Sequence, residues 1–191
     1  LGKILRSGSQ PDSKFILCLA SYKALCDFKY GHLIVENPDI QDVYRRQFSE
    51  PKKEIRVSEE IPRLGEVSDQ VSKEVQGQFH KNPFPKWVYT VLTARAEPIS
   101  VFLKQKNIRI VDKSLNQIAS PEILVAGCGT GEHAIAALQT FSGSKVLAID
   151  LSMASVAHAK RKTEEMGVEG IDYIQGDILN LRDLAKTFDL I

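Results

Sequence analysis

Cysteine is scarce in this sequence, and long apolar runs are missing. The 191 residues include three cysteines, Cys18, Cys26 and Cys128, and no two of them have CxxC spacing. An odd number without paired spacing argues against a disulfide framework and a zinc site, and it is typical of a reducing compartment. No apolar run approaches the roughly 20 residues that cross a bilayer. We therefore expect a cytoplasmic protein without a metal site or a membrane partner.

The sequence also has no excess of charge of either sign. Lysine and arginine together number 25, aspartate and glutamate 24, and the formal net charge is +1. A polyanionic partner would require a basic excess or a basic surface interleaved with aromatic residues, and neither is recognisable. We therefore expect no nucleic-acid partner.

The sequence divides into a mainly helical N-terminal region, 1–115, and an α/β region, 116–191. Alternating charge with Pro51, Pro62 and Gly65 predicts a solvated linker near 49–65, and Pro51 is expected to end the helix before it. Helical spacing of apolar residues predicts helices at 13–28, 38–48 and 66–79, and a further one from Glu97 onwards. The N-terminal helices are a candidate surface for a protein partner.

The strongest pattern lies between Glu122 and Asp150. An apolar run, 123–126, is followed by glycines at three alternate positions, a helical pattern and a second apolar run, 146–149, that ends in Asp150. This order predicts strand, glycine turn, helix, strand and acid, which is the first unit of a nucleotide-binding sheet.

The pattern continues to the last residue. A helix is expected at 153–166, a third strand at 171–175, a short helix around 181–186 and the opening of a fourth strand at 188–191. The expected fold is a Rossmann-like, doubly wound α/β sheet with its first three strands and the start of the fourth, preceded by the helical region. Because the chain starts at Leu1 and stops as a strand begins, we expect a fragment of a longer protein.

The glycine turn predicts a site for a nucleotide-like ligand. Its glycines allow a ligand to lie against the main chain, and the N-terminus of the next helix favours a negatively charged group. Asp150, at the end of the second strand, is placed to accept hydrogen bonds from ribose hydroxyls, with capping of the next helix as the alternative. Asp177 ends the third strand, where it would accept a hydrogen bond from an adenine amino group, and Ile178 would lie against the ring.

The spacing of the glycines separates two classes of cofactor. A dinucleotide site favours G-x-G-x-x-G, but here the third glycine comes one residue early and Glu132 stands in its place. The observed G-x-G-x-G is the form found where S-adenosylmethionine binds. An NAD-dependent oxidoreductase and a non-catalytic binding module that recruits a protein through its N-terminal helices stay as alternatives.

Residues 122–191 resemble the class I S-adenosylmethionine-dependent methyltransferases. The motifs that carry the resemblance are the glycine turn, the acids that end the second and third strands, and the fourth-strand opening 188–191. The resemblance implies methyl transfer to an unidentified acceptor, with S-adenosylmethionine as cofactor. Residues implied to bind the cofactor are Gly127, Cys128, Gly129, Thr130, Gly131, Asp150, Leu151, Asp177 and Ile178.

A second similarity lies upstream, in residues 78–87. This segment is similar to one that precedes the methyltransferase domain in proteins with tetratricopeptide repeats, which implies repeats before Leu1 and a partner bound through them. Asn82, Phe84 and Trp87 are the candidates for a lid over the ligand, and the alternative is an aromatic plug between the helices and the sheet. The stripe of Val67, Val71, Val75 and Phe79 on the preceding helix is interpreted as core packing.

The sequence departs from the family at one position and leaves the catalytic residues unidentified. Val125 stands where the family usually has an acid that supports the methionine end of the cofactor. Cys128 is expected to be a small side chain in the turn rather than a nucleophile. Since the substrate-facing groups of the family usually follow the fourth strand, we expect the chain alone to be inactive.

Overall fold

The structure is a computed structural model that describes residues 1–81, 83, 85–91, 95–109 and 113–191. These residues form two compact units, Leu1–Arg56 and Val57–Ile191. None of the helices in the described ranges is both long and apolar enough to cross a membrane. The extended piece expected around Ile110 and Val111 lies outside the described residues.

The first unit is helical. It contains α1 (Gly2–Arg6), α2 (Ser13–Ala20), two single 3-10 turns (Leu25–Asp27 and Gly31–Leu33), and α3 (Gln41–Tyr44). A π-helical turn, Arg45–Ser49, joins α3 to α4 (Glu50–Glu60). The core of this first unit consists of Leu5, Ile16, Ala20, Leu25, Ile34, Ile40 and Phe48.

The helix expected at 13–28 ends at Ala20 because of a tertiary contact. The side chain of Gln47 accepts a hydrogen bond from Leu25 N (3.2 Å) and donates one to Ala20 O (3.0 Å). These bonds replace two helical ones, so the chain can turn and bury Leu25. At the start of α2, the side chain of Asp12 accepts a hydrogen bond from Lys14 N, as a helix cap does.

The range expected to be a linker, 49–65, holds regular structure instead. Pro51 was predicted to end a helix, and this prediction is wrong, because α4 runs through it to Glu60. Proline is tolerated in a first turn, where its missing N–H costs no helical bond, and the π turn before α4 places Pro51 there. Val57 and Ile61 pack into the core of the second unit, which the charged pattern around them concealed.

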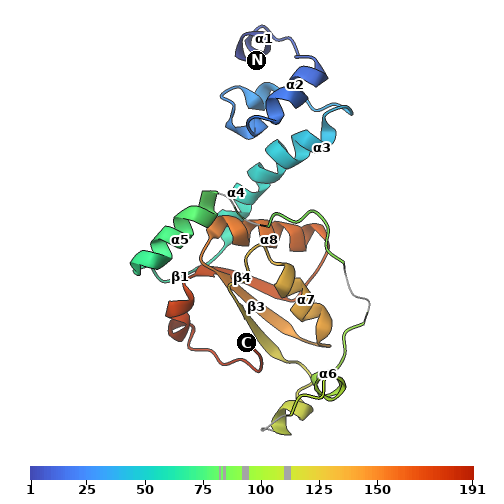
Figure 1. Cartoon of the computed structure of the whole chain (residues 1–191), viewed down its shortest axis with the longest axis vertical. Coiled ribbons are helices and arrows are strands. Elements are labelled where there is room, and N and C mark those ends of the chain that lie inside the picture. The colour runs from blue at the N-terminus through green and yellow to red at the C-terminus, as the bar shows by residue number, and fades with distance from the viewer. Residues whose placement is uncertain (82, 84, 92–94, 110–112) are drawn as a thin grey trace. The chain divides into compact units, whose positions relative to one another are not determined.

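The second unit contains the predicted parallel sheet (Figure 1). Its strands are β1 (Arg63–Leu64), β2 (Glu122–Ala126), β3 (Lys145–Asp150) and β4 (Ile171–Gly176), in the order β1-β4-β3-β2. Leu190 bridges Ile123 in parallel on the other side of β2, which is where the start of the fourth predicted strand belongs. Strand β1 at the opposite edge was not predicted, because two residues carry no periodicity. The Rossmann-like α/β fold is confirmed, with helices preceding the sheet.

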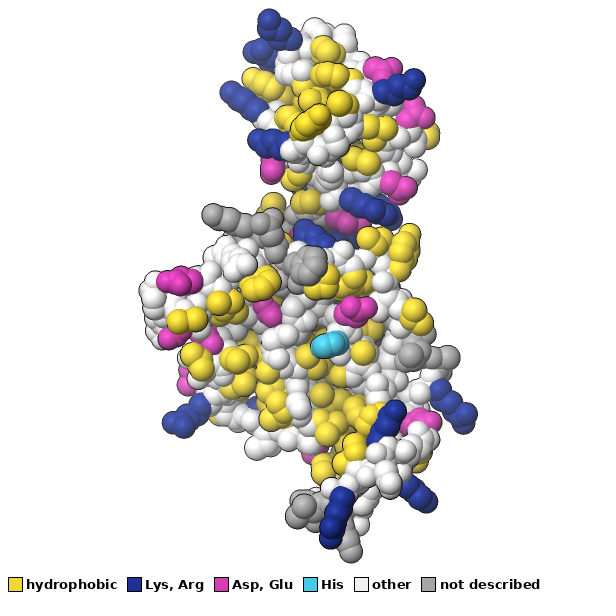
Figure 2. All heavy atoms as spheres, viewed as in Figure 1, with side chains coloured by type: hydrophobic (Ala, Val, Ile, Leu, Met, Phe, Trp, Pro, Cys, Tyr) yellow, Lys and Arg dark blue, Asp and Glu magenta, His cyan; other side chains and the backbone are white. Residues whose placement is uncertain are grey.

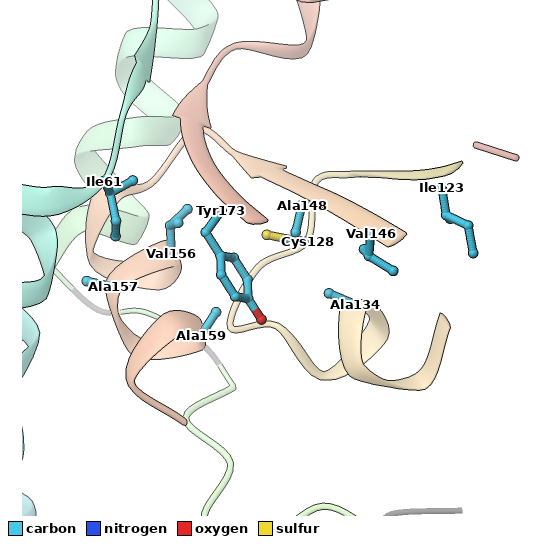
Figure 3. Packing of buried hydrophobic residues seen from close by; sticks show 10 residues of the cluster. All are labelled: Ile61, Ile123, Cys128, Ala134, Val146, Ala148, Val156, Ala157, Ala159 and Tyr173. Carbon is cyan, nitrogen blue, oxygen red and sulfur yellow. The ribbon is translucent and has the colours of Figure 1, made fainter. Parts of the chain in front are cut away.

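Helices cover the two faces of the sheet differently. The side chains of β2, β3 and β4 alternate between two clusters, as strand geometry requires. On one face Ile123, Val146 and Tyr173 pack with α7 (Glu132–Thr140) and α8 (Met153–Glu165) (Figure 3). On the other face Leu147 and Ile149 pack with the 3-10 segment η5 (Ile178–Leu184) and the residues after it.

The remaining elements of the second unit are α5 (Gln70–Lys81), α6 (Ile99–Gln105) and a 3-10 segment, Lys113–Gln117. Pro98 precedes α6, as its start signal predicted. Ring contact between Phe102 of α6 and Phe141 after α7 (5.0 Å between centroids) holds α6 against the sheet domain.

Helix α8 has a buried cationic side that the sequence did not predict. The run of charged residues in 160–165 is typical of a solvated helix face, yet Arg161 and Lys162 are only 5% and 6% exposed. The Lys162 ammonium lies 5.2 Å from the ring centroid of Trp87, and Glu165 pairs with both cations, at 2.9 Å from Arg161 and 3.4 Å from Lys162. Long cationic side chains bury their stems under such cover while keeping a charged partner, so a polar pattern does not exclude burial.

Asp189 anchors the last residues to the sheet. Its carboxylate accepts a hydrogen bond from Glu122 N (2.8 Å), and its own N–H donates to Glu122 O (2.8 Å). Asp189→Ala leaves the half-buried Glu122 N–H without this acceptor, so we expect the free energy of unfolding to fall by about 1–2 kcal/mol. Urea unfolding measures it, with Asp172→Ala on the exposed side of β4 as control. Equal losses for the two variants would contradict the anchoring role.

Candidate functional site

The turn between β2 and α7 combines two kinds of glycine. Gly127, Gly129 and Gly131 all have positive φ, at 77°, 54° and 92°. A Cβ on Gly127 or Gly129 would have no atom within 4 Å, so open space lies beside the main chain there. A Cβ on Gly131 would lie 2.5 Å from Ala159 Cβ and 3.1 Å from the Tyr173 hydroxyl. The first two glycines thus leave room for a ligand, whereas the third lets the turn approach α8.

Asp150 fastens this turn. One carboxylate oxygen accepts a hydrogen bond from Gly129 N (2.8 Å), and the other accepts one from Ser152 N (2.8 Å). The helix cap of α8 is Ser152, whose hydroxyl accepts from Ser155 N, so Asp150 is not needed for that task. A carboxylate has about four acceptor positions, which leaves capacity for ligand hydroxyls. The position of Asp150 at the end of β3 is as the sequence predicted.

A cavity of about 260 Å³ lies beside the turn and Asp150. Three of the predicted cofactor residues line it, namely Gly129, Asp150 and Leu151. The other lining residues are Ser152 and Ser155 from α8 and Val75, Gln76 and Phe79 from α5.

Trp87 and Thr130 lie together outside this lining. The Trp87 indole N–H donates to Thr130 O (2.8 Å), and the Thr130 hydroxyl donates to Pro85 O (2.6 Å). The Trp87 ring meets the His158 ring edge-on, with centroids 6.0 Å apart. Trp87 therefore packs against the turn and α8, and the plug interpretation stays a prediction. Asn82 and Phe84, the other two lid candidates, lie outside the described residues, and the lid stays a prediction.

Asp177 and Ile178 sit at the end of β4, next to the end of β3. Asp177 is buried, and its carboxylate accepts a hydrogen bond from Leu179 N (2.9 Å) at the start of η5. Ile178 is half exposed. Neither residue lines the cavity, so their predicted adenine contacts stay predictions. Two residues earlier, Gln175 donates from its side chain to Leu151 O (3.1 Å) and ties β4 to the cavity wall.

Cys128 is buried inside the turn. Burial, together with the nearby negative charge of Asp150, raises the pKa of its thiol far above the ordinary value. The thiol therefore stays protonated at neutral pH and is a poor nucleophile, which agrees with the small-side-chain interpretation. Val125, where the family usually has an acid, packs against the apolar cluster under α7 and α8.

The part of α5 that lines the cavity was not predicted from the sequence. Val75 and Phe79 were interpreted as core residues, but they are 39% and 38% exposed and face the cavity. Gln76 donates from its side chain to Leu151 O (3.0 Å) and was not predicted to have a role. The amphipathic pattern of 66–79 is visible in the sequence. The sequence does not show that this helix lies next to the glycine turn, because the two are far apart along the chain.

The site as a whole offers an open main chain, a carboxylate and a partly apolar wall. Within the described ranges, no three His, Cys, Asp or Glu side chains cluster as metal ligands do. This arrangement fits a nucleoside-bearing ligand, because a ribose supplies hydroxyl donors for Asp150 and a base supplies a flat apolar face.

Gly131→Ala tests the close approach of the turn to α8. The added Cβ would meet Ala159 and strain a positive-φ backbone, so we expect a loss of about 2–4 kcal/mol in the free energy of unfolding. Gly167→Ala is the matched control, because its φ is +64° and a Cβ there meets nothing within 4 Å. Its loss should be only about 1 kcal/mol, from backbone strain. Equal losses in denaturant unfolding would show that the contact with α8 is unimportant.

Thiol labelling tests the state of Cys128. In the folded chain at pH 8, iodoacetamide should modify the exposed Cys18 and Cys26 but leave Cys128 unmodified, because burial disfavours its thiolate. Mass spectrometry should find two adducts on the native chain and three after unfolding in guanidinium. Three adducts formed at similar rates on the native chain would contradict the buried, protonated thiol.

Comparison with known proteins identifies the segment that carries this site. Residues 123–191 match a family model described as "Methyltransferase domain". The chain is also similar to PKMT2 from Rickettsia typhi in complex with AdoHcy, with 24% identity over 37% of this chain and 14% of that one and a TM-score of 0.34. Phosphoethanolamine N-methyltransferase 2 from Haemonchus contortus in complex with S-adenosyl-L-methionine is 20% identical over 42% of this chain and 17% of that one, with a TM-score of 0.32.

A third similar structure is coclaurine N-methyltransferase bound to N-methylheliamine and SAH, with 13% identity over 92% of this chain and 55% of that one and a TM-score of 0.41. The chain thus spans well under two thirds of the length of these proteins. The family match agrees with the expected methyltransferase domain. Residues 123–191, with the glycine turn and Asp150, are the part of this chain that matches a methyltransferase domain.

Proposed function

We propose that this chain is the cofactor-binding part of an S-adenosylmethionine-dependent methyltransferase. The observation that carries the proposal is the bond between Asp150 and Gly129, which joins the carboxylate expected to bind ribose to an open glycine turn on the wall of one cavity. This pair lies inside the segment that matches a methyltransferase domain.

The residues present fit this cofactor. Asp150 would hold the ribose hydroxyls, and the main chain at Gly127 and Gly129 leaves room for the rest of the molecule. Helix α7 begins directly after the turn, and its N-terminus favours the carboxylate of the methionine end. Because Val125 supplies no charge for the amino group, main-chain carbonyls or groups near Trp87 would take over that contact.

When bound, the cofactor supplies a methyl group on a sulfonium with a neutral leaving group. The protein then has mainly to align the acceptor with that methyl group and exclude water. The turn, fastened by Asp150 and sealed by Trp87, provides a rigid support for one reactant. We assign no acceptor and no catalytic residue, and we expect the chain alone to bind the cofactor without turnover.

The glycine spacing favours this cofactor over NAD. Glu132 occupies the position where a dinucleotide site favours glycine, and Gly131 one residue earlier makes the close contact with α8. A non-catalytic module that binds the cofactor is the second candidate, and turnover of acceptors would exclude it. Repeats preceding this chain, and a partner bound through them, remain a prediction from the similarity of residues 78–87.

Equilibrium binding tests the proposed function. Calorimetry on the chain should detect S-adenosylmethionine and S-adenosylhomocysteine but not NAD. Asp150→Asn keeps the shape of the side chain and removes its charge and one acceptor, so affinity should fall by about 5- to 100-fold, equivalent to 1–3 kcal/mol. Asp172→Asn, on the exposed side of β4, should bind as the unmodified chain does. Tight binding of NAD without binding of S-adenosylmethionine would refute the proposal.

A further inference from the structure

Helix α5 is oriented with its polar side toward the domain. Ser72 and Gln76, one turn apart, are its half-buried residues. The apolar stripe of Val71, Val75 and Phe79 is 66%, 39% and 38% exposed. An amphipathic helix in a globular protein normally shows the opposite arrangement. Over α5, hydrophobic side chains reach the surface among charged ones (Figure 2).

Polar contacts hold α5 in this orientation. Gln76 of α5 and Gln175 of β4 both donate their side-chain N–H groups to Leu151 O, at 3.0 Å and 3.1 Å. Asp69 directly precedes the helix, and its carboxylate accepts a hydrogen bond from Ser72 N (2.8 Å), as a helix cap does. Leu151 directly follows Asp150, so Gln76 ties α5 to the segment expected to hold the ribose.

The apolar stripe then faces the cavity only in part. Val75 and Phe79 line it together with Gly129, Asp150 and Leu151, whereas Val71 does not. These two side chains lie beside the residues that follow β3, and Trp87 is not part of this lining. A flat aromatic base in this space would cover the apolar surface that the protein leaves exposed, which the hydrophobic effect favours.

We infer that α5 forms the wall for the nucleoside half of the cofactor, with Val75 and Phe79 contacting it and Gln76 acting as a positioning residue through Leu151. This inference rests on the proposed function. It assigns a binding role to a helix outside the segment that matches a methyltransferase domain, 123–191. It also gives a reason for the exposure of Val75 and Phe79, whose apolar area becomes buried only when the site is filled.

Two matched pairs of variants test the inference. Val75→Ala is compared with Val71→Ala, which makes the same change one turn earlier on the same stripe but outside the cavity. Gln76→Leu is compared with Gln78→Leu, the same change at an exposed position of α5. Because alanine and leucine are good helix formers, none of these changes should unfold α5. Phe79→Ala is added as the largest removal of wall surface.

The ligands are S-adenosylhomocysteine and 5′-methylthioadenosine, which share the nucleoside and differ at the amino-acid end. Phe79→Ala should weaken both by roughly 5- to 20-fold, and Val75→Ala by roughly two- to fivefold. Gln76→Leu should weaken both by roughly three- to tenfold, mainly through faster dissociation, because the wall is no longer held to Leu151. The two control variants should bind both ligands as the unmodified chain does.

The possible results separate this inference from the proposed function. If the unmodified chain binds S-adenosylhomocysteine and the wall variants match their controls, α5 is not the wall, while the proposed function stands. A loss confined to S-adenosylhomocysteine places α5 at the amino-acid end and overturns the inference as well. If the unmodified chain binds neither ligand, both the proposed function and the inference fail.

Discussion

The hydrogen bond from Gly129 N to Asp150 joins the glycine turn after β2 to the point where β3 ends and leads into α8. A turn with three glycines has many accessible conformations, so its shape depends on contacts with its surroundings. Gly127 N and Cys128 N both donate to Ile149 O of β3, and the Asp150 carboxylate adds the bond to Gly129 N. With its second oxygen the carboxylate also holds Ser152 at the start of α8. One side chain thereby connects the turn, the strand end and the helix start.

Two further contacts restrain the same turn from the side away from the cavity. Gly131 lies against Ala159 of α8, where a larger residue would not fit. Thr130 exchanges hydrogen bonds with the segment of Pro85 and Trp87. On the cavity side, among the described residues, no atom lies within 4 Å of the position that a Cβ on Gly129 would take. A site that is rigid on one side and open on the other binds a ligand without the entropic cost of ordering a loop.

The features that local patterns encode were predictable from the sequence. The strands around Ile123, Val146 and Ile171, the positions of the glycines and Asp150 at a strand end all follow from periodicity and motif spacing. Each of these strands is connected to the next by a short helical segment, and such a connection places consecutive strands side by side and parallel.

Features that depend on contacts between distant segments were not predictable. Gln47 ends α2 early by bonding to residues more than 20 positions away, and a π turn lets α4 continue through Pro51. Lys162 stands in a charged run that favours exposure, but its side chain is buried because Trp87 covers it. The stripe of α5 has the spacing of a core helix, yet a side-chain bond from Gln76 rotates it toward a cavity. For Gln47, Lys162 and Gln76, a tertiary contact outweighs a local preference of a few tenths of a kcal/mol to about 1 kcal/mol per residue.

Trp87 is the only tryptophan in the chain, and its indole N–H is bonded to the main chain of the glycine turn. Its ring also lies beneath the Lys162 ammonium, and both the bond and the charge influence the emission of an indole. The chain thus carries a single indole fluorophore, attached to the part of the chain on which its site is built. Any movement of that turn changes the surroundings of this ring, so its fluorescence reports the state of the site without an added dye.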